Sequence, residues 1–308
     1  MAPPFILAPL ARRAAISTRG NRLLSDVSVT RTSKPIIRVD GGRSSLGGHT
    51  VTVFGATGQL GRYIVNRLSR QGCTVVVPFR EEMAKRHLKV TGDLGRVVFV
   101  EYDLRNTPSI EASVRHSDAV YNLVGRNYST KNFSLEDVHI EASERIVEAV
   151  AKYDIDRYIH VSSHSANPSS KSEFYATKGR GELVVRNIFP ETTLVRPAPM
   201  FGFEDNLLLK LASVLNLFTA NNMQEKFWPV HSVDVGAAME KMLYDDSTAG
   251  HTFELYGPRL YSIEPGDIAD YTYHYLQGFR SSNYYDLPPA TEREKKEDKK
   301  YIHVLDEL

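Results

Sequence analysis

A glycine-rich turn between a short apolar run and a helical pattern constrains this chain more than any other feature. Residues 51–54 are Val-Thr-Val-Phe, and glycines follow at positions 55, 58 and 61. The apolar run predicts a buried strand, and the apolar spacing after it predicts a helix. Gly55 would allow a tight turn, Gly58 a close approach of backbone N–H groups to phosphate, and Gly61 close packing of helix on strand. The turn therefore predicts a nucleotide site at a helix N-terminus.

The same turn supplies further candidate contacts. Thr57, Gln59 and Leu60 lie between the glycines and are predicted to contact the nucleotide together with them. A glycine pattern of this kind also occurs at ordinary strand-to-helix turns. The strand before it and the helix after it favour nucleotide binding.

The end of the next predicted strand, residues 74–79, indicates which nucleotide binds. An acidic residue at this position would bind a ribose 2′-hydroxyl. This chain has Arg80 there instead. A guanidinium attracts a 2′-phosphate, which favours NADP(H) over NAD(H). The alternative is a solvated arginine beside Glu81 and Glu82.

Strands and helices alternate from the glycine turn onward. Further strands are predicted at residues 74–79, 97–101, 119–124, 157–161 and 192–195, and helices at 59–70, from 81, from 108, and at 135–153 and 173–187. Apolar strands that alternate with helices predict a parallel sheet covered on both faces. The expected fold is α/β, a doubly wound sheet of the Rossmann type, with ligands at the carboxyl ends of the strands.

Residues at the later strand ends are candidates for the rest of the site. Asp103 and Leu104 follow the third strand and can contact adenine, although Asp103 can equally cap a turn. Val124 and Gly125 end the fourth strand beside the expected nicotinamide half, although Gly125 can be a turn residue only. Pro197 ends the sixth strand and would form one wall of the pocket.

Composition excludes several classes of function. Lys plus Arg number 38 and Asp plus Glu 37, so no net field suggests a nucleic-acid partner. The single cysteine, Cys73, excludes an intrachain disulfide and a cysteine-rich metal cluster. No apolar run approaches the roughly 20 residues of a membrane-spanning helix. Any membrane contact is therefore predicted to be peripheral, and no metal site is predicted.

Residues 1–46 differ in character from the rest. No acidic residue precedes Asp26, and arginines alternate with apolar and hydroxyl residues, as in a mitochondrial transit peptide. The alternative is a disordered basic tail. Cleavage is predicted before the glycine-rich linker at 41–48, with the folded domain starting near His49. Residues 47–260 are then the NAD(P)-binding domain, and residues 261–308 a C-terminal arm.

Several motifs together resemble an atypical extended short-chain dehydrogenase/reductase. More closely, residues 47–258 are similar to the Rossmann-type accessory subunits of mitochondrial respiratory complex I, NADH:ubiquinone oxidoreductase, of fungal type. The motifs include Val-Val-Pro-Phe-Arg-Glu-Glu at 76–82, Val-Tyr-Asn-Leu-Val-Gly-Arg at 120–126 and Val-Arg-Pro-Ala-Pro-Met-Phe-Gly at 195–202. The resemblance implies a peripheral subunit on the matrix side of the inner membrane that holds NADPH tightly without turning it over, among other complex I subunits.

The catalytic positions of the reductases are incomplete. An active member pairs a tyrosine with a lysine four positions later, but the residue four before Lys178 is Phe174. Tyr175 would lie about 100° around the helix. Ser163, or Ser162 if the register differs by one, keeps a hydroxyl, and Lys178 can still bind ribose. Ser163, Tyr175 and Lys178 are thus interpreted as vestigial, unless Tyr175 acts through a distorted helix start.

The C-terminal third leaves alternatives open. Residues 203–218 are apolar and helical in pattern, and such a segment can cover a substrate or dock on another subunit. The segments around 252–258 and 264–270 nearly abut, which indicates either a deletion relative to the family or an alternative gene model. Besides the structural subunit, two hypotheses remain: a mitochondrial NADP-dependent reductase or epimerase, and a nucleotide-sensing regulator that changes partners.

Overall fold

A seven-stranded parallel sheet forms the centre of the structure, a computed structural model that describes residues 25–29, 32–33, 35–39, 48–93, 95–203, 205, 208–213, 228–257 and 276. The strand order is β11-β8-β7-β6-β3-β4-β5, and every neighbouring pair is parallel. The strands are β3 (Thr50–Phe54), β4 (Thr74–Phe79), β5 (Val97–Glu101), β6 (Ala119–Asn122), β7 (Arg157–Val161), β8 (Thr193–Pro197) and β11 (Thr252–Leu255). The predicted doubly wound sheet is confirmed.

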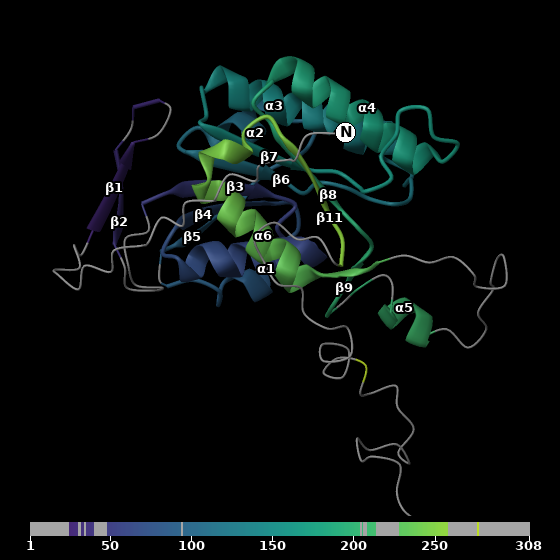
Figure 1. The fold of residues 1–308 in the computed structure, drawn as a ribbon, viewed down its shortest axis with the longest axis horizontal. Coiled ribbons are helices and arrows are strands. Elements are labelled where there is room, and N and C mark those ends of the chain that lie inside the picture. Colours follow the sequence, from purple (N-terminus) through teal and green to yellow (C-terminus); the bar gives the residue numbers. More distant parts are fainter. Residues whose placement is uncertain are drawn as a thin grey trace, which may run out of the picture.

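Helices cover both faces of this sheet (Figure 1). On one face lie α1 (Gln59–Arg70) and α6 (Ser232–Tyr244). On the other lie α2 (Thr107–Val114), α3 (Ala142–Lys152) and α4 (Glu173–Ile188). Short helical turns complete the layers: η2 (Arg86–Leu88), η3 (Asp137–Glu141) and η5 (Asp246–Thr248).

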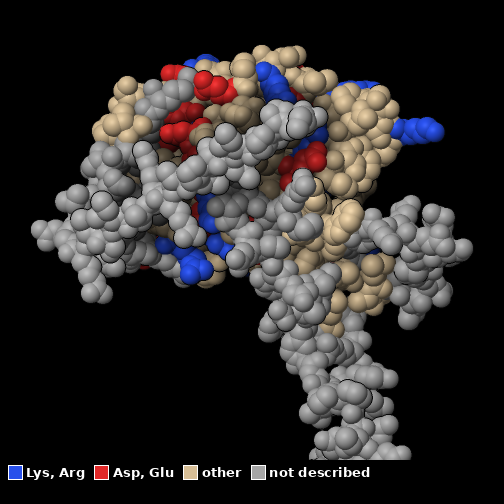
Figure 2. All heavy atoms as spheres, in the orientation of Figure 1, with Lys and Arg blue, Asp and Glu red and all other residues tan. Residues whose placement is uncertain are grey.

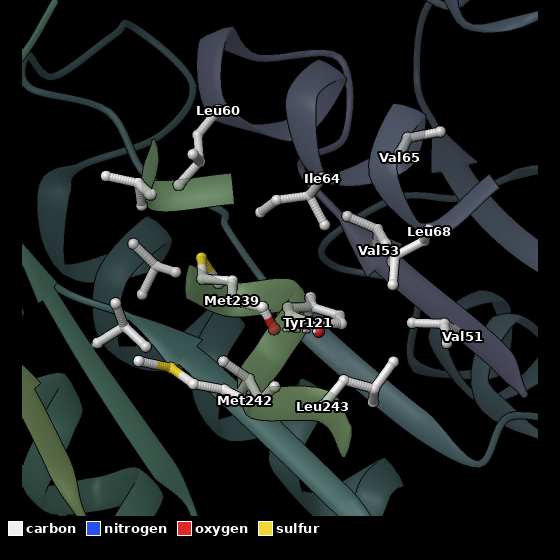
Figure 3. Packing of buried hydrophobic residues seen from close by; sticks show 14 of the residues in the cluster. Val51, Val53, Leu60, Ile64, Val65, Leu68, Tyr121, Met239, Met242 and Leu243 are labelled. Atoms are coloured by element: carbon white, nitrogen blue, oxygen red, sulfur yellow. Dashed lines mark hydrogen bonds between the residues drawn. The ribbon is translucent and has the colours of Figure 1, made fainter. Parts of the chain in front are cut away.

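Two hydrophobic clusters hold the layers together, one on each face of the sheet. Successive side chains of a strand point to opposite faces, so Val51 and Val53 of β3 join the cluster under α1 and α6, whereas Phe54 joins the other. Figure 3 shows side chains of α1 and α6, including Ile64 and Met239, meeting over the central strands. Removal of this apolar surface from water is the main force that fixes the helices on the sheet.

Polar contacts fix how α6 lies against α1. The Gln59 side-chain amide donates to Ser232 Oγ at 3.1 Å, and Arg67 pairs with Glu240 at 3.3 Å. Tyr121 of β6 donates from its hydroxyl to the Met239 carbonyl at 2.9 Å, inside the core. The first turn of α1, which follows the glycine turn, is therefore held from the side by the start of α6.

Several elements differ from those predicted. Strand β11, which pairs with β8, was not predicted, and residues 203–218 give only the short helix α5 (Leu208–Ser213) within the described part. The N-cap of helix α6 is His231, whose ring accepts from the Val233 N–H. Strands β9 (Met200–Phe201) and β10 (Val230–His231) form a short parallel pair.

An antiparallel hairpin lies within the segment predicted as targeting peptide and linker. It consists of β1 (Ser25–Val29) and β2 (Pro35–Val39). At its turn, Thr32 donates from its backbone N–H at 2.8 Å and from its hydroxyl at 3.1 Å to the carboxylate of Asp156. Folded structure thus precedes the expected domain start near His49.

Other predictions lie outside the described residues, namely residues 1–24 and all of the C-terminal arm except Leu276. The helices within the described ranges are all too short or too polar to cross a membrane. On the face drawn in Figure 2, acidic and basic side chains are both present, and neither sign covers the described surface.

Candidate functional site

A cleft with a volume of about 170 Å³ lies at the carboxyl ends of β3, β4, β5 and β6. The predicted site residues that line it are Gly55, Thr57, Gly58, Arg80, Leu104, Val124 and Gly125. The lining residues that sequence reasoning missed are Pro78, Phe79, Tyr102, Leu123, Arg126, Phe133 and Val138. Strand order therefore brings together residues as far apart in the sequence as Gly55 and Val138, as the doubly wound topology requires.

The glycine turn has the geometry that only glycine allows. Gly55 has a φ of +76°, and a Cβ there would lie 2.9 Å from the carbonyl carbon of Leu123. A Cβ on Gly61 would lie 2.4 Å from the carbonyl oxygen of Ala56, so the helix can approach the turn only with glycine here. Both glycines let β3, α1 and the end of β6 converge at one side of the cleft.

The N-terminus of α1 is open toward the cleft. Gly58 is the N-cap, no side chain caps the helix, and the first turn contains no acidic residue. The N–H of Gly58 itself donates to the Gly55 carbonyl at 3.1 Å, so this glycine stabilises the turn, and the donors available to a ligand are those of the following residues. Such a terminus attracts anions through unpaired N–H groups and the helix dipole.

Arg80 lies at the tip of β4, where it was predicted, with an exposed side chain. Its neighbour Glu82 pairs instead with Lys85 at 2.5 Å, and the Lys85 ammonium lies 3.6 Å from the centre of the Phe79 ring. In the described part of the chain, no carboxylate forms an ion pair with Arg80. Burial raises the pKa of Tyr102 to about 12, and the positive charge of Arg80 opposes that rise. The guanidinium is therefore available to an anionic ligand.

The other predicted contacts lie away from the cleft lining. Asp103 Oδ1 accepts from the Arg105 N–H at 2.8 Å, which corresponds to the alternative of a turn cap. Gln59 is bonded to Ser232, Leu60 is buried in the core, and Pro197 lies in β8 with its carbonyl accepting from the His164 N–H. In this structure these side chains serve the fold around the site.

Asn122 shapes the end of β6 and was missed by sequence reasoning. Its side-chain oxygen accepts from the Val124 N–H at 3.0 Å, and its amide nitrogen lies 3.1 Å from the Tyr158 hydroxyl and 3.3 Å from His160 Nδ1. The residue is fully buried. A buried asparagine at the end of an apolar strand is the sequence signal that could have indicated it, because buried amides need partners.

Phe174 lies where the resemblance places the catalytic acid. Its ring packs edge-on against His139, with 5.3 Å between ring centres, and Lys178 follows one helical turn later. The Lys178 ammonium is only 3.0 Å, and His139 Nε2 3.9 Å, from where a Cβ on Gly125 would lie. Tyr175 packs on the Phe174 ring at 5.2 Å. An apolar ring, not a phenol, thus lies one helical turn before Lys178 and packs on His139.

Lys178 is buried, and its pKa lies below the ordinary value of a lysine. Burial lowers its pKa to about 8, although Glu182 opposes this shift, and its ammonium donates to the Val161 carbonyl at 3.2 Å. Nearby, the hydroxyl of Ser162 and Nε2 of His160 are buried and have no hydrogen-bond partner. Ser162, rather than the half-buried Ser163, is the first residue after β7. These polar atoms beside the cleft could satisfy the hydroxyl groups of a bound ligand.

His139 comes from the π-helical turn η3 that precedes α3. Its Nδ1 lies 2.9 Å from the Thr177 hydroxyl, and its Nε2 accepts from the Arg126 N–H at 3.3 Å. Burial, and secondarily the charge of Lys178, lowers the pKa of His139 to about 3, so the ring is neutral. A π turn shifts the helical spacing by one residue, which explains why periodicity did not indicate this contact. Across the described residues, no cluster suited to a metal ion occurs.

Comparison with known proteins shows the family to which this chain belongs. Residues 51–186 match the NAD dependent epimerase/dehydratase family. The chain is 60% identical to the mitochondrial NADH-ubiquinone oxidoreductase 40 kDa subunit of Neurospora crassa, over 92% of this chain and 94% of that protein. The chain belongs to the family of this 40 kDa subunit. It is also 42% identical to the mitochondrial NADH dehydrogenase [ubiquinone] 1 alpha subcomplex subunit 9 of Arabidopsis thaliana, over 77% of this chain and 60% of that protein.

The alignment with the Neurospora 40 kDa subunit spans 351 residues, more than the 308 of this chain. The relative therefore has residues without a counterpart here. Among solved structures, the fold is similar to the UDP-glucuronic acid 4-epimerase of Bacillus cereus in complex with NAD, with a TM-score of 0.57 and 18% identity over 72% of this chain and 81% of that one. It is also similar to the Bordetella bronchiseptica enzyme WbmH in complex with NAD+, with a TM-score of 0.56 and 16% identity over 69% and 77%. These two likenesses concern the fold.

Proposed function

We propose that this chain is a non-catalytic accessory subunit of mitochondrial complex I that binds NADPH as a structural ligand and supports assembly or stability of the complex. One observation carries the proposal: the residue four positions before Lys178 in α4, where an active reductase needs a proton-transferring phenol, is Phe174, and its ring packs on His139. A phenyl ring can neither donate nor accept a proton. The residues that would hold a nucleotide are nevertheless present.

The residues of the cleft fit a dinucleotide. The uncapped N-terminus of α1 would hold the pyrophosphate, and Lys178 and Ser162 would face ribose hydroxyls beside Gly125. Arg80, without an ion pair to any described carboxylate, would take the 2′-phosphate and so favour NADPH over NADH. When bound, the nicotinamide ring would supply a hydride, but the position from which the reductases donate the proton is occupied by Phe174.

The names of the relatives support the place of action. The Neurospora relative is named as a mitochondrial subunit of NADH-ubiquinone oxidoreductase, and the Arabidopsis relative as a mitochondrial subunit of NADH dehydrogenase [ubiquinone]. We therefore propose other complex I subunits as partners and a peripheral position on the matrix side of the inner membrane. Residues before Ser25 would be the targeting segment, because the β1–β2 hairpin bonds to Asp156 and belongs to the folded protein.

The first test is the native size of the tagged protein from mildly solubilised mitochondria, with identification of any nucleotide that it releases on denaturation. Co-migration with a very large inner-membrane assembly and release of stoichiometric NADPH are expected. Migration as a free monomer or dimer would contradict the subunit role. Release of NAD(H) alone would contradict the assignment of Arg80.

Arg80→Asp tests the choice of nucleotide. Because a carboxylate repels a 2′-phosphate, we expect the dissociation constant for NADPH to rise by at least about tenfold, with little change for NADH. Arg115→Asp, at an exposed arginine that ends α2, serves as the control for charge alone. Equal losses for NADPH and NADH would refute the 2′-phosphate contact.

A soluble NADP-dependent reductase or epimerase is the second candidate. Lys178, whose pKa is lowered to about 8, and the adjacent Tyr175 are the observations that favour it. This function predicts turnover of a carbonyl or sugar substrate that collapses in Tyr175→Phe. Unchanged nucleotide oxidation in that variant would exclude Tyr175 as the acid.

A further inference from the structure

Arg126 is a second cationic residue of the cleft, on the opposite side from Arg80. Arg80 ends β4, and Arg126 follows β6 after a short loop. In the sheet, β3 lies between these two strands. Both arginines line the same cleft, so the glycine turn at the end of β3 lies between two arginine-bearing strand ends.

Hydrogen bonds through His139 fix the backbone of Arg126. Its N–H donates to His139 Nε2 at 3.3 Å, and His139 Nδ1 lies 2.9 Å from the Thr177 hydroxyl. That hydroxyl in turn donates to the Phe174 carbonyl at 3.0 Å. Because Nε2 must accept, Nδ1 carries the ring proton, and every polar group in the chain of bonds has a partner. The segment after β6 is thus tied to helix α4.

The guanidinium of Arg126 is supported by an aromatic ring. Its guanidinium lies 5.1 Å from the centre of the Tyr128 ring, within the range of a cation–π contact. Among the described residues, no Asp or Glu forms an ion pair with it. Tyr128 itself is 60% exposed. A half-buried arginine that lines a cleft without a carboxylate is placed to receive an anion from the cleft.

We infer that Arg126 binds the pyrophosphate of the dinucleotide while Arg80 binds its 2′-phosphate. This inference rests on the proposed nucleotide site. The position of Gly55 decides between the two phosphates: a Cβ there would touch the Leu123 carbonyl, so the end of β6 lies directly against the turn that opens α1. Arg126 follows Leu123 by three residues on the β6 side of this turn, whereas Arg80 follows β4, on the other side of β3.

Titration calorimetry of the nucleotide-free full-length protein with NADPH, NADH and ADP-ribose tests the inference. All three ligands contain the pyrophosphate, but only NADPH has the 2′-phosphate. Arg126→Gln should weaken all three by a similar factor of about tenfold or more, because a charge-assisted hydrogen bond is lost. Arg80→Gln should weaken NADPH alone. Arg126→Lys should recover part of the affinity, since it keeps the charge.

Three results separate the possibilities. Unchanged affinities in Arg126→Gln, or a loss confined to NADPH, would overturn the pyrophosphate assignment while leaving the nucleotide site in place. Absence of binding by the unmodified protein would remove the site itself, and the inference with it. The thermal unfolding temperature of each ligand-free variant, compared with that of Arg115→Gln, confirms that any loss arises from the contact and not from misfolding.

Discussion

Burial of Lys178 should lower the free energy of unfolding of the ligand-free protein at neutral pH, and Lys178→Met should raise it. The lysine is 7% exposed and its pKa in the folded state is about 8, against an ordinary value of 10.5. That difference corresponds to about 3 kcal/mol, since each pKa unit is worth about 1.4 kcal/mol. Methionine fills a similar volume without a charge but leaves the Val161 carbonyl without its donor, at a cost of about 1 kcal/mol. The expected net gain at pH 7 is therefore about 2 kcal/mol.

The stability difference between the unmodified protein and Lys178→Met should depend on pH. Between pH 8 and 10.5 the unfolded chain keeps a proton on Lys178 that the folded chain has released, so the stability of the unmodified protein rises with pH in that window. Below pH 8 the burial cost is present in full. The advantage of Lys178→Met should thus be largest at or below pH 7 and should shrink steadily toward pH 10.

Urea unfolding of the nucleotide-free protein and variant, at pH 7 and at pH 9.5, measures this difference. Lys131→Met removes an exposed lysine and should change stability by less than about 0.5 kcal/mol at either pH. A gain for Lys178→Met that is the same at both pH values, or a loss at pH 7, would refute the reasoning. A buried lysine that costs stability is expected where it serves a ligand, so saturating NADPH should stabilise the unmodified protein more than the variant.

Two further substitutions test the packing of the site. Gly61→Ala should lower the free energy of unfolding by about 1–3 kcal/mol, because the new Cβ meets the Ala56 backbone. The control Asn66→Ala, in the same helix, should change the free energy of unfolding little. Equal urea midpoints for the two variants would contradict this prediction. Ser162→Ala should leave the free energy of unfolding unchanged or raise it by up to about 1 kcal/mol, since the Ser162 hydroxyl has no hydrogen-bond partner. Thr52→Val should lower the free energy of unfolding by about 1–2 kcal/mol, because the Thr52 hydroxyl donates to the Ser113 carbonyl. The reverse order in chemical denaturation would show that the Ser162 hydroxyl is satisfied in solution.

The sequence predicted the parts of the fold that depend on neighbouring residues. Apolar runs gave β7 its bounds, and the glycine spacing placed the turn, α1 and the cleft together. These features could be predicted because strand and helix periodicity and turn chemistry are local properties.

The elements that were missed depend on contacts between distant residues. Strand β11 is only four residues long and contains Glu254, so its pattern is weak. It becomes a strand through pairing with β8, and Glu254 pairs with Arg196 at 3.2 Å. Arg126 and His139 are brought together by a hydrogen bond and by the π turn η3, which interrupts the regular helical spacing. Neither feature produces a periodic pattern in the sequence. The β1–β2 hairpin was hidden by a basic composition that is typical of targeting peptides.

The order of the strands also governs when the cleft can form as the chain is made. Strands β3, β4 and β5 are consecutive and adjacent, so the first half of the sheet can pair as it emerges. The other wall of the glycine turn is the end of β6, which arrives about 65 residues after β3 and must insert on the opposite side of it. Contacts between distant segments form late because they carry the entropy of closing a long loop. A partly synthesised chain that ends before β6 would thus have the glycine motif but no complete cleft, so a ligand can stabilise the chain only after β6 has joined the sheet.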